Sequence, residues 1–354
     1  RFKERVAWHG DSAEGNPSGG NKFRGLYNIV LKSIGAAMKR HPDVPLDFCI
    51  DYGESMNEPG YYFMDSPGND LESIAGQVAA GCNLIFFVTG NGSITNFPFV
   101  PTLKVVTTTK RYEKLSQDMD INAGAYLDGI SMDNLGAELF DHTLKISGGD
   151  RSLGEKANHS QTQIWRDWPQ TSSVALESLA NCPSIYGFGL KPELDEVPDV
   201  RIDMLRCRGK WVSDQVGLIL PTSLCSGQVA KKIAERLNEN GVGRSSGISR
   251  FTSLVHTEGC GVGGVGTEDI YTRSLISYLR HPLVHSALLL EHGCEKTHND
   301  FMRNCIRDAG MDVDSFGWAS VQMDGGISAS MACAETYFHK IANNLKVATR
   351  GEVG

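Results

Sequence analysis

Strand-length apolar runs and helix-length amphipathic stretches alternate along most of this chain. Apolar or β-branched runs long enough for a strand occur at 46–51, 61–64, 83–88, 102–108, 216–220, 251–255, 287–290 and 316–323. Apolar residues at helical spacing occur at 26–40, 71–80, 132–146, 301–306 and 327–345. Such alternation favours parallel sheets covered by helices. The sequence therefore predicts an α/β fold with two Rossmann-like, open, mainly parallel sheet domains flanked by helices.

A polar stretch with several prolines separates the two regular regions. We predict a first α/β domain at 1–150, a linker at 151–199, a second α/β domain at 200–346 and a frayed tail at 347–354. A chain of 354 residues is long enough for each domain to bury its own core. Trp165 and Trp168 are expected to attach the linker to a domain surface.

In the second region, the strands expected at 216–220, 251–255 and 287–290 each end in a loop rich in chemically active groups. These loops hold five potential metal ligands: Cys225, His256, Cys260, His292 and Cys294. The three cysteines recur about every 35 residues, about the length of one βα unit. Parallel strands would bring all three loops to the carboxyl edge of one sheet, where open α/β sheets bind ligands.

These three loops admit five chemical interpretations. Half-buried structural cysteines in glycine-rich turns are the simplest one. The close ligand pairs of a structural zinc and the spacings of a ferredoxin cluster are both missing. A catalytic divalent cation with nitrogen, oxygen and sulfur ligands fits best, with Lys296 as the expected base and His256 and Glu295 as further catalytic candidates. A cysteine hydrolase, with Cys225 as the nucleophile and His256 as its partner, is the other catalytic class.

The first region carries polar loops that suit a hydroxylated acid. Eight residues are predicted to bind substrate: Asn16, Ser18, Asn21, Lys22, Thr89, Asn91, Asp120 and Asn122. The segment 16–22 precedes a predicted helix, whose N-terminal end favours anions. The glycines at 90 and 92 are a weak phosphate signal, because the rest of a dinucleotide motif is missing. Ordinary surface loops and turns are the simpler interpretation of these segments.

Composition excludes some classes of partner. The net charge is −8 and the pI is about 5.7, and the basic residues are scattered, so no nucleic-acid surface is expected. No apolar stretch reaches the length of a membrane span. Nine cysteines, an odd number, suit a reducing compartment, so we expect a cytoplasmic protein. The chain lacks an initiator Met, which suggests a piece of something longer.

Several of these segments together resemble a known family. The segments 16–22, 81–92, 100–104 and 118–124 look like parts of the C-terminal domain of the altronate/galactarate dehydratase family, in the same order. The segments 256–261 and 293–296 are similar to the His-x-x-Gly-Cys-Gly and Gly-Cys-Glu-Lys motifs of its middle domain.

The resemblance implies a carbon–oxygen lyase that removes water from a sugar acid and forms a 2-keto-3-deoxy acid. It implies a divalent metal cofactor, Fe²⁺ first and Mn²⁺ as the alternative. A base would remove the proton next to the carboxylate while the metal or an acid helps the hydroxyl group to leave. A sulfolactate-type carbon–sulfur lyase subunit and a non-catalytic copy that assembles with or regulates an active dehydratase are the alternatives.

The chain also departs from the family pattern. The region similar to the middle domain follows the C-terminal region here, whereas it usually precedes it. The small N-terminal β domain is missing, and Asn91 stands where the family usually has an Arg. These departures imply either the C-terminal part of a longer enzyme or the need for a small β-domain subunit. A homo-oligomer is expected.

Overall fold

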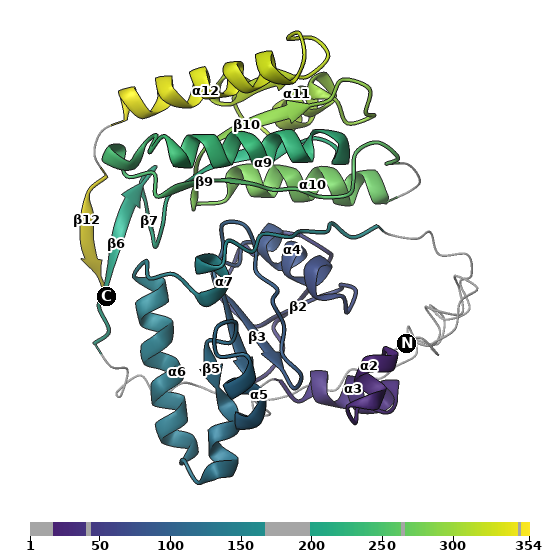
Figure 1. Cartoon of the computed structure of the whole chain (residues 1–354), viewed down its shortest axis with the longest axis vertical. Coiled ribbons are helices and arrows are strands. Elements are labelled where there is room, and N and C mark those ends of the chain that lie inside the picture. Colours follow the sequence, from purple (N-terminus) through teal and green to yellow (C-terminus); the bar gives the residue numbers. More distant parts are fainter. Residues whose placement is uncertain (1–16, 40–43, 167–198, 263–265, 346–347) are drawn as a thin grey trace.

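Helices and mainly parallel sheets alternate through this computed structural model, which describes residues 17–39, 44–166, 199–262, 266–345 and 348–354 (Figure 1). Three of its four sheets are wholly parallel and one is antiparallel. The predicted α/β fold class is therefore confirmed.

The first half of the chain contains two small parallel sheets, β1-β2 and β3-β4-β5. Its elements are α2 (Gly19–Phe23), α3 (Ile29–Ala37), β1 (Phe48–Ile50), β2 (Tyr62–Met64), α4 (Asp70–Ala80), β3 (Ile85–Thr89), β4 (Thr102–Val106), α5 (Thr109–Lys114), β5 (Ile121–Asn122), η2 (Ala123–Asp128), α6 (Met132–Ser147) and α7 (Leu153–Lys156). The single helix predicted at 26–40 is shorter, because the Asn28 side chain accepts the Leu31 N–H at 2.9 Å and caps α3.

The second half contains a four-stranded parallel sheet and a small antiparallel one. Its elements are β6 (Ile202–Cys207), β7 (Lys210–Val212), β8 (Val216–Pro221), α9 (Leu224–Glu239), η4 (Arg244–Ser246), β9 (Arg250–Ser253), α10 (Thr267–Arg280), β10 (Val284–Glu291), α11 (Asn299–Asp308), η5 (Val313–Ser315), β11 (Gly317–Ser320), α12 (Ile327–Asn344) and β12 (Arg350–Val353).

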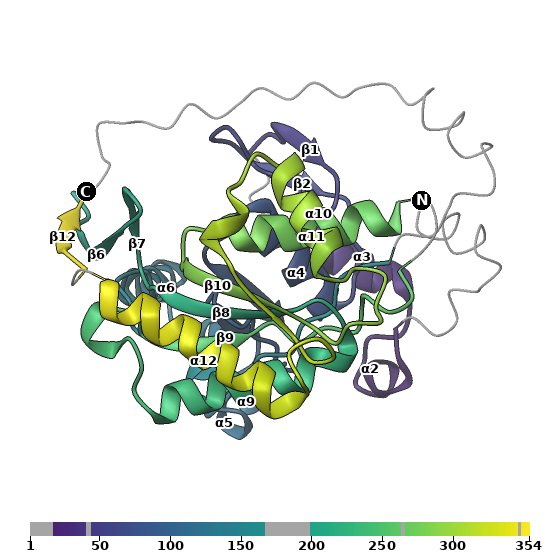
Figure 2. The ribbon, with the colours of Figure 1, turned by 90° about the horizontal axis from the view of Figure 1, so that it is seen from above.

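The four-stranded sheet has the order β11-β10-β8-β9. Helices α9 and α12 pack together on one face, and α10 and α11 pack on the other (Figure 2). Its two central strands are buried along nearly their whole length because both faces are covered. From β8 the chain moves to β9 on one side, and then crosses to β10 and β11 on the other. The strand order therefore reverses between β8 and β10, which is where such sheets bind ligands.

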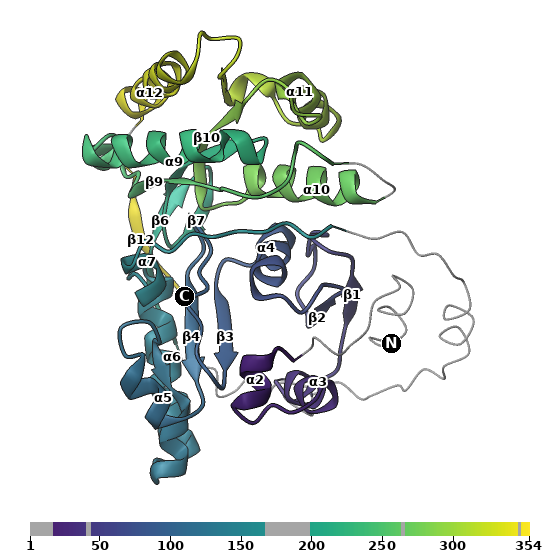
Figure 3. The same cartoon turned by 45° about the vertical axis from the view of Figure 1, so that its right-hand side comes forward.

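Helix α10 joins the two halves through a shared core. It packs against α4, and the Tyr278 hydroxyl donates to the Ala75 carbonyl at 2.9 Å (Figure 3). Arg273 donates to the Tyr52 carbonyl at 3.0 Å, and the Trp165 ring packs edge-on against Tyr52, as expected for the linker. One buried cluster contains side chains from both halves. The boundaries at 150 and 200 stay a prediction, while Trp168 and most of the linker lie outside the described residues.

The C-terminal strand β12 corrects one expectation. Arg350–Val353 pairs with Ile202–Leu205 of β6 in an antiparallel sheet, and Arg350 Nε lies 2.7 Å from Asp203 Oδ2. The prediction of a frayed tail at 347–354 is therefore wrong for these residues. Main-chain hydrogen bonds to a distant strand hold a polar segment that has no apolar pattern of its own.

His281 is buried at the contact between the two halves. Its Nε2 lies 3.3 Å from the Cys82 carbonyl oxygen, its Nδ1 accepts the Leu283 N–H at 3.3 Å, and its ring packs against Phe99. Burial lowers the pKa of His281 to about 4, against an ordinary value of 6.5. The folded protein therefore holds this ring neutral.

We expect the free energy of unfolding to decrease as the pH falls from 6.5 toward 4. In this range the unfolded state binds a proton on His281 that the folded state does not, at about 1.4 kcal/mol per pH unit. Burial also lowers the pKa of His256 and His285 to about 4, so several residues contribute. Urea unfolding at pH 7 and pH 5 checks this, and His281→Gln should show a shallower pH dependence. The same slope in both proteins would contradict it.

Candidate metal centre

Three loops meet at the carboxyl edge of the four-stranded sheet, beside the point where the strand order reverses. They are residues 222–225 after β8, the last two of which begin α9, then 256–260 after β9 and 292–297 after β10. The Thr222 N–H donates to Leu290 O at 3.0 Å and the Leu224 N–H donates to Glu258 O at 3.0 Å, so the first loop is tied to both others. This is the edge at which the sequence predicted a site.

The carboxylate of Glu295 organises these loops. It is 2% exposed, and its Oε1 accepts the hydroxyl groups of Thr222 at 2.8 Å and Ser223 at 3.0 Å. It also accepts the N–H groups of His292 at 2.8 Å and Gly293 at 2.6 Å. Burial alone would raise the pKa of Glu295, but hydrogen bonds from backbone N–H groups and Thr222 outweigh it and lower the pKa. The protein therefore keeps a buried negative charge at this edge.

Gly259 allows the second loop to approach the first. Its φ is +109°, and a Cβ there would lie 2.2 Å from the Thr222 carbonyl oxygen. That oxygen accepts the Tyr271 hydroxyl at 2.8 Å and the Thr297 hydroxyl at 2.9 Å. A side chain at position 259 would therefore separate the loops that carry the site.

The predicted thiols come together in pairs with other ligand groups. Cys225 Sγ lies 3.7 Å from Cys260 Sγ, and Cys294 Sγ lies 3.2 Å from His292 Nδ1. The three cysteines are exposed. The hydrogen bond with Cys260 and the charge of that group raise the pKa of Cys225, with smaller effects from Cys294 and Glu295. Thiols lose their protons when they bind a metal, so a bound cation would stabilise the crowded thiolates of this edge.

Three of these groups are close enough to share one metal ion. Ligand atoms of His292, Cys294 and Glu295 all lie within 4.8 Å of one another. One nitrogen, one sulfur and one oxygen donor suit a borderline cation such as Fe²⁺, Mn²⁺ or Zn²⁺ better than Mg²⁺ or Ca²⁺. The donor set present therefore fits the expected divalent metal.

His256 does not join this group in the way the sequence predicted. It is 1% exposed, its Nε2 lies 2.8 Å from the Pro221 carbonyl oxygen, and its Nδ1 accepts the Glu258 N–H at 3.1 Å. Burial lowers its pKa to about 4. Both ring nitrogens are thus engaged with the backbone in this structure, where the residue supports the loop, and its predicted role stays a prediction.

Lys296, the expected base, is half-exposed and forms an ion pair with Glu268 of α10. The pair fixes the lysine one residue after Glu295, on the loop that carries Cys294 and His292. Its position next to the cluster is compatible with the predicted role.

The predicted substrate-binding residues of the first half form a separate group. Asn91 Nδ2 donates to Asn21 Oδ1 at 2.9 Å, and Asn21 Nδ2 donates to Ser18 Oγ at 3.1 Å. Thr89 Oγ1 accepts the Gly92 N–H at 3.2 Å and shapes the same loop. Lys22 lies in the last turn of α2, and Asn16 lies outside the described residues. Residues 18–22 and the loop of residues 89–92 therefore meet.

Asp120 and Asn122 are engaged in the fold. Buried Asp120 accepts the N–H groups of Lys104 and Leu153, both at 2.9 Å, which leaves it little capacity for a substrate hydroxyl. Asn122 Nδ2 donates to Thr109 Oγ1 at 3.0 Å. Figure 3 shows the carboxyl ends of β3 and β4 pointing away from the four-stranded sheet. The predicted substrate-binding residues and the candidate metal ligands thus lie at the edges of two different sheets.

Sequence reasoning missed the residues that hold the loops in place. Thr222, Ser223, Tyr271 and Thr297 supply the hydroxyl groups that anchor Glu295 and the Thr222 carbonyl. A Thr-Ser pair before a helix indicates only a helix cap, and Ser223 makes no side-chain cap bond. No local signal identified their partner more than 70 residues away.

Comparison with known proteins accounts for most of the chain. Residues 1–170 match the family model "D-galactarate/Altronate dehydratase, C-terminal" and residues 216–346 match "D-galactarate dehydratase/Altronate hydrolase, second domain". The chain belongs to the D-galactarate/altronate dehydratase family. The two matched regions occur in the reverse of the order that their descriptions give, as the motifs suggested.

Three curated relatives show which enzymes this dehydratase-family chain is similar to and over what length. Altronate dehydratase of Escherichia coli (strain K12) is 30% identical over 165 residues, 47% of this chain and 33% of the relative. Galactarate dehydratase (L-threo-forming) of the same strain is 27% identical over 181 residues, which are 48% of this chain and 34% of the relative. The (2R)-sulfolactate sulfo-lyase subunit beta of Chromohalobacter salexigens is 27% identical over 157 residues, which are 44% of this chain and 40% of the relative. The chain thus spans about a third of the length of the curated dehydratases it matches. Among its described residues, no helix has both the length and the apolar character needed to cross a membrane.

We expect Glu295→Gln to destabilise this dehydratase-family chain by about 1.5–3 kcal/mol, because the amide removes a charged acceptor from two backbone N–H groups and two hydroxyls. Urea unfolding at pH 7 measures the change. Glu138→Gln, at an exposed position on α6, is the matched control and should stay within about 0.5 kcal/mol of the parent. Equal stability of the two variants would refute the organising role.

Proposed function

We propose that this chain is a carbon–oxygen lyase, a hydro-lyase that removes water from a sugar acid with the help of a divalent cation. The observation that carries the proposal is the group of His292, Cys294 and Glu295 at the reversal point of the sheet. It occurs in a chain that belongs to a dehydratase family. The product would be a 2-keto-3-deoxy acid.

His292, Cys294 and Glu295 would hold the cation, with Cys225 and Cys260 beside them. When bound, an Fe²⁺ or Mn²⁺ ion would supply Lewis-acid stabilisation of a substrate oxygen. Glu295 also fixes the backbone of His292 and Gly293, so the ligand loop is formed before the ion arrives. His256 is left out of this set because its ring nitrogens bond to the backbone.

Lys296 is the group we assign to proton transfer. Glu268 holds its Nζ at a defined position on the exposed side of the ligand loop. Once the ammonium group has released a proton to solvent, the free amine there can take the proton next to the substrate carboxylate and later return it to solvent, since the side chain is half-exposed. Glu295 accepts hydrogen bonds from four groups and is therefore a positioning residue and ligand, not a base.

Ser18, Asn21, Lys22 and Asn91 are the groups we assign to substrate binding. Their amide, hydroxyl and ammonium groups match the hydroxyls and carboxylate of a sugar acid. They lie on a different edge from the ligand loop, so one chain does not bring the two groups face to face. We therefore infer that a second copy of the chain completes the site.

The α2–α3 segment supports contact with a second copy. Phe23, Tyr27, Ile34 and Met38 are 90%, 69%, 55% and 75% exposed, and this apolar face adjoins Asn21. A copy seated on this face would bring its own ligand loop toward the substrate group. The free state of all eight described cysteines is consistent with the reducing cytoplasm expected from the sequence.

A carbon–sulfur lyase subunit remains the second candidate. The match to (2R)-sulfolactate sulfo-lyase subunit beta covers 40% of that relative, more than the 33% of the altronate dehydratase. That relative is a subunit, and we infer the same dependence on a partner here.

We predict stoichiometric bound metal in chain purified without oxygen and supplied with ferrous iron. His292→Ala and Cys294→Ser should each lower the metal content and 2-keto acid formation, because each removes one donor atom of the group. Elemental analysis and a 2-keto acid assay with altronate, galactarate and sulfolactate measure both. A chelator should abolish product formation.

Cys333→Ser is the matched control, since this exposed thiol lies on α12 outside the group. It should keep its metal and its activity. Full metal content in both ligand variants would exclude the metal centre, and product formation without metal would exclude its role in the reaction.

Sedimentation should show a dimer or larger assembly, and Ile34→Asp should shift it toward the monomer by placing a charge on the apolar face. Ile130→Asp is the control, because Ile130 is comparably exposed and follows η2, away from α3. A monomeric parent chain, or equal effects of both substitutions, would contradict the proposed contact.

A further inference from the structure

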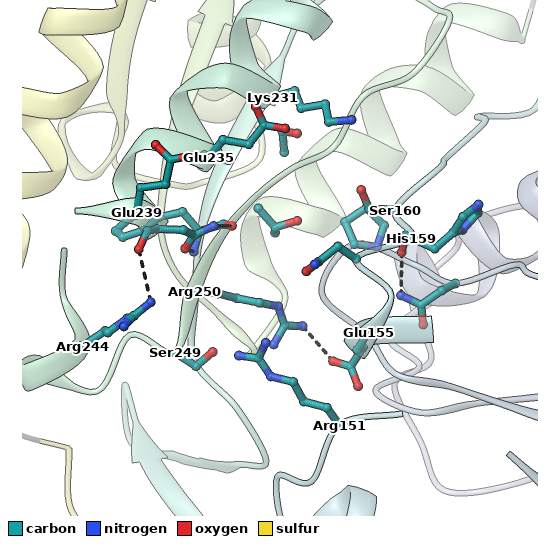
Figure 4. Close-up of a pocket in the computed structure, with 18 residues that line it drawn as sticks. Arg151, Glu155, His159, Ser160, Lys231, Glu235, Glu239, Arg244, Ser249 and Arg250 are labelled. Atoms are coloured by element: carbon teal, nitrogen blue, oxygen red, sulfur yellow. Dashed lines mark hydrogen bonds and ion pairs between the residues drawn. The ribbon is translucent and has the colours of Figure 1, made fainter. Parts of the chain in front are cut away.

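A cavity lies beside the C-terminal half of α9, away from the cysteine loops at its start. It has a volume of about 560 Å³ and opens between the α7 segment of the first half and α9 with β9 of the second (Figure 4). No cysteine lines it. Figure 4 shows Arg151 and Glu155 on one side, facing Arg250, Glu235 and Lys231 on the other. Nothing in the proposed dehydration uses this cavity.

Three buried polar atoms beside the cavity have no hydrogen-bond partner among the described residues. Asn96 is 2% exposed, and its Nδ2 donates to the carbonyl oxygens of Phe97 at 3.0 Å and His159 at 2.9 Å. Its Oδ1 is buried and has no hydrogen-bond partner, and the same holds for His159 Nδ1 and Ser249 Oγ. All three residues line the cavity. Buried polar atoms are rarely left unsatisfied, so each calls for a partner from outside the chain.

A glycine allows the backbone to approach Asn96 closely behind the lining residues. A Cβ at Gly154 would lie 2.8 Å from Asn96 Cβ and 2.8 Å from Lys104 Nζ. Lys104 Nζ is buried as well, and its nearest charge is Asp120 at 3.8 Å. The backbone at Gly154 therefore packs tightly against Asn96 and Lys104, and only glycine fits there.

Three cations of the lining, Arg151, Lys231 and Arg244, are left over among the described residues after the ion pairs are counted, against two carboxylates, Glu235 and Glu239. Arg250 is compensated by Asp214 at 2.5 Å and Glu155 at 2.8 Å. Arg151, half-buried on the other side, has no carboxylate partner among the described residues. Lys231 on the outer rim has none there either. An anion is the ligand that an unpaired, partly buried guanidinium binds most strongly.

The open edge of β9 is closed to a peptide. Asn238 accepts the Phe251 N–H at 2.7 Å and donates to the Phe251 carbonyl at 2.8 Å, so this side chain occupies the place of a further strand. The occupant is therefore a small molecule and not an added strand.

We propose that this cavity binds a small hydroxylated organic anion, a carboxylate or phosphate ester that carries several hydroxyl groups. Arg151 binds the anionic group. Asn96 Oδ1 accepts a hydrogen bond from one hydroxyl group of the ligand, and His159 Nδ1 and Ser249 Oγ form hydrogen bonds with further hydroxyl groups. An anion without carbon-bound hydroxyl groups cannot reach all three polar atoms at once, and a neutral polyol has no charge for Arg151, so both features of the ligand are required. The site is independent of the proposed metal centre.

Isothermal titration of the full chain tests this with four probes: gluconate, glycerol 3-phosphate, inorganic phosphate and glycerol. We expect saturable binding of gluconate or glycerol 3-phosphate. Binding of gluconate would indicate a carboxylate ligand, and binding of glycerol 3-phosphate would indicate a phosphate ester. Arg151→Gln should weaken that binding by about tenfold or more, the effect of losing a charge-assisted hydrogen bond. Ser249→Ala should weaken it to a smaller extent.

Lys156→Gln is the matched control, since Lys156 is an exposed cation of the same α7 segment outside the cavity. It should bind like the parent, and so should Cys294→Ser, which separates this site from the metal centre. Binding of neither hydroxylated anion, or equal binding by Arg151→Gln and the parent, would overturn the proposal. Inorganic phosphate that binds as tightly as both would indicate an adventitious ion only.

Discussion

The buried carboxylate of Glu295 is the constraint on which the candidate site depends. Removing a carboxylate from water is costly unless hydrogen bonds replace its hydration. Here two hydroxyls from the loop after β8 and two N–H groups of its own loop supply them. The charge thereby ties together the two strands between which the sheet order reverses. Loops that would otherwise vary in conformation are held where His292 and Cys294 meet.

The shared core around α10 gives this arrangement its support. One surface of α10 covers the four-stranded sheet, and Tyr278 and Arg273 reach α4 and the loop after β1. Tyr271, on the same helix, donates to the Thr222 carbonyl beneath the metal loops. Helix α10 therefore contacts both the first half of the chain and the site, so a change in how the halves pack reaches the loops through one rigid element.

Elements with strong periodicity were predictable from the sequence, and so was the edge of the sheet that carries the thiols. Continuous apolar runs identified β8 and β10, and the short interval between cysteines indicated successive parallel strands. The role of His256 was not predictable, because a motif does not reveal that both ring nitrogens bond to backbone groups. Strand β12 was missed for a related reason. Its partner Leu205 lies far earlier in the chain, and pairing of main-chain groups leaves no pattern in side chains.

The side chain of Asn238 has a consequence for how this molecule behaves in a crowded solution. An exposed sheet edge can act as a template on which other chains add strands and aggregate. By mimicking one residue of a neighbouring strand, Asn238 removes the central donor and acceptor of that edge. Growth of the sheet from copy to copy through β9 is thereby blocked, which leaves β11 as the other edge of this sheet.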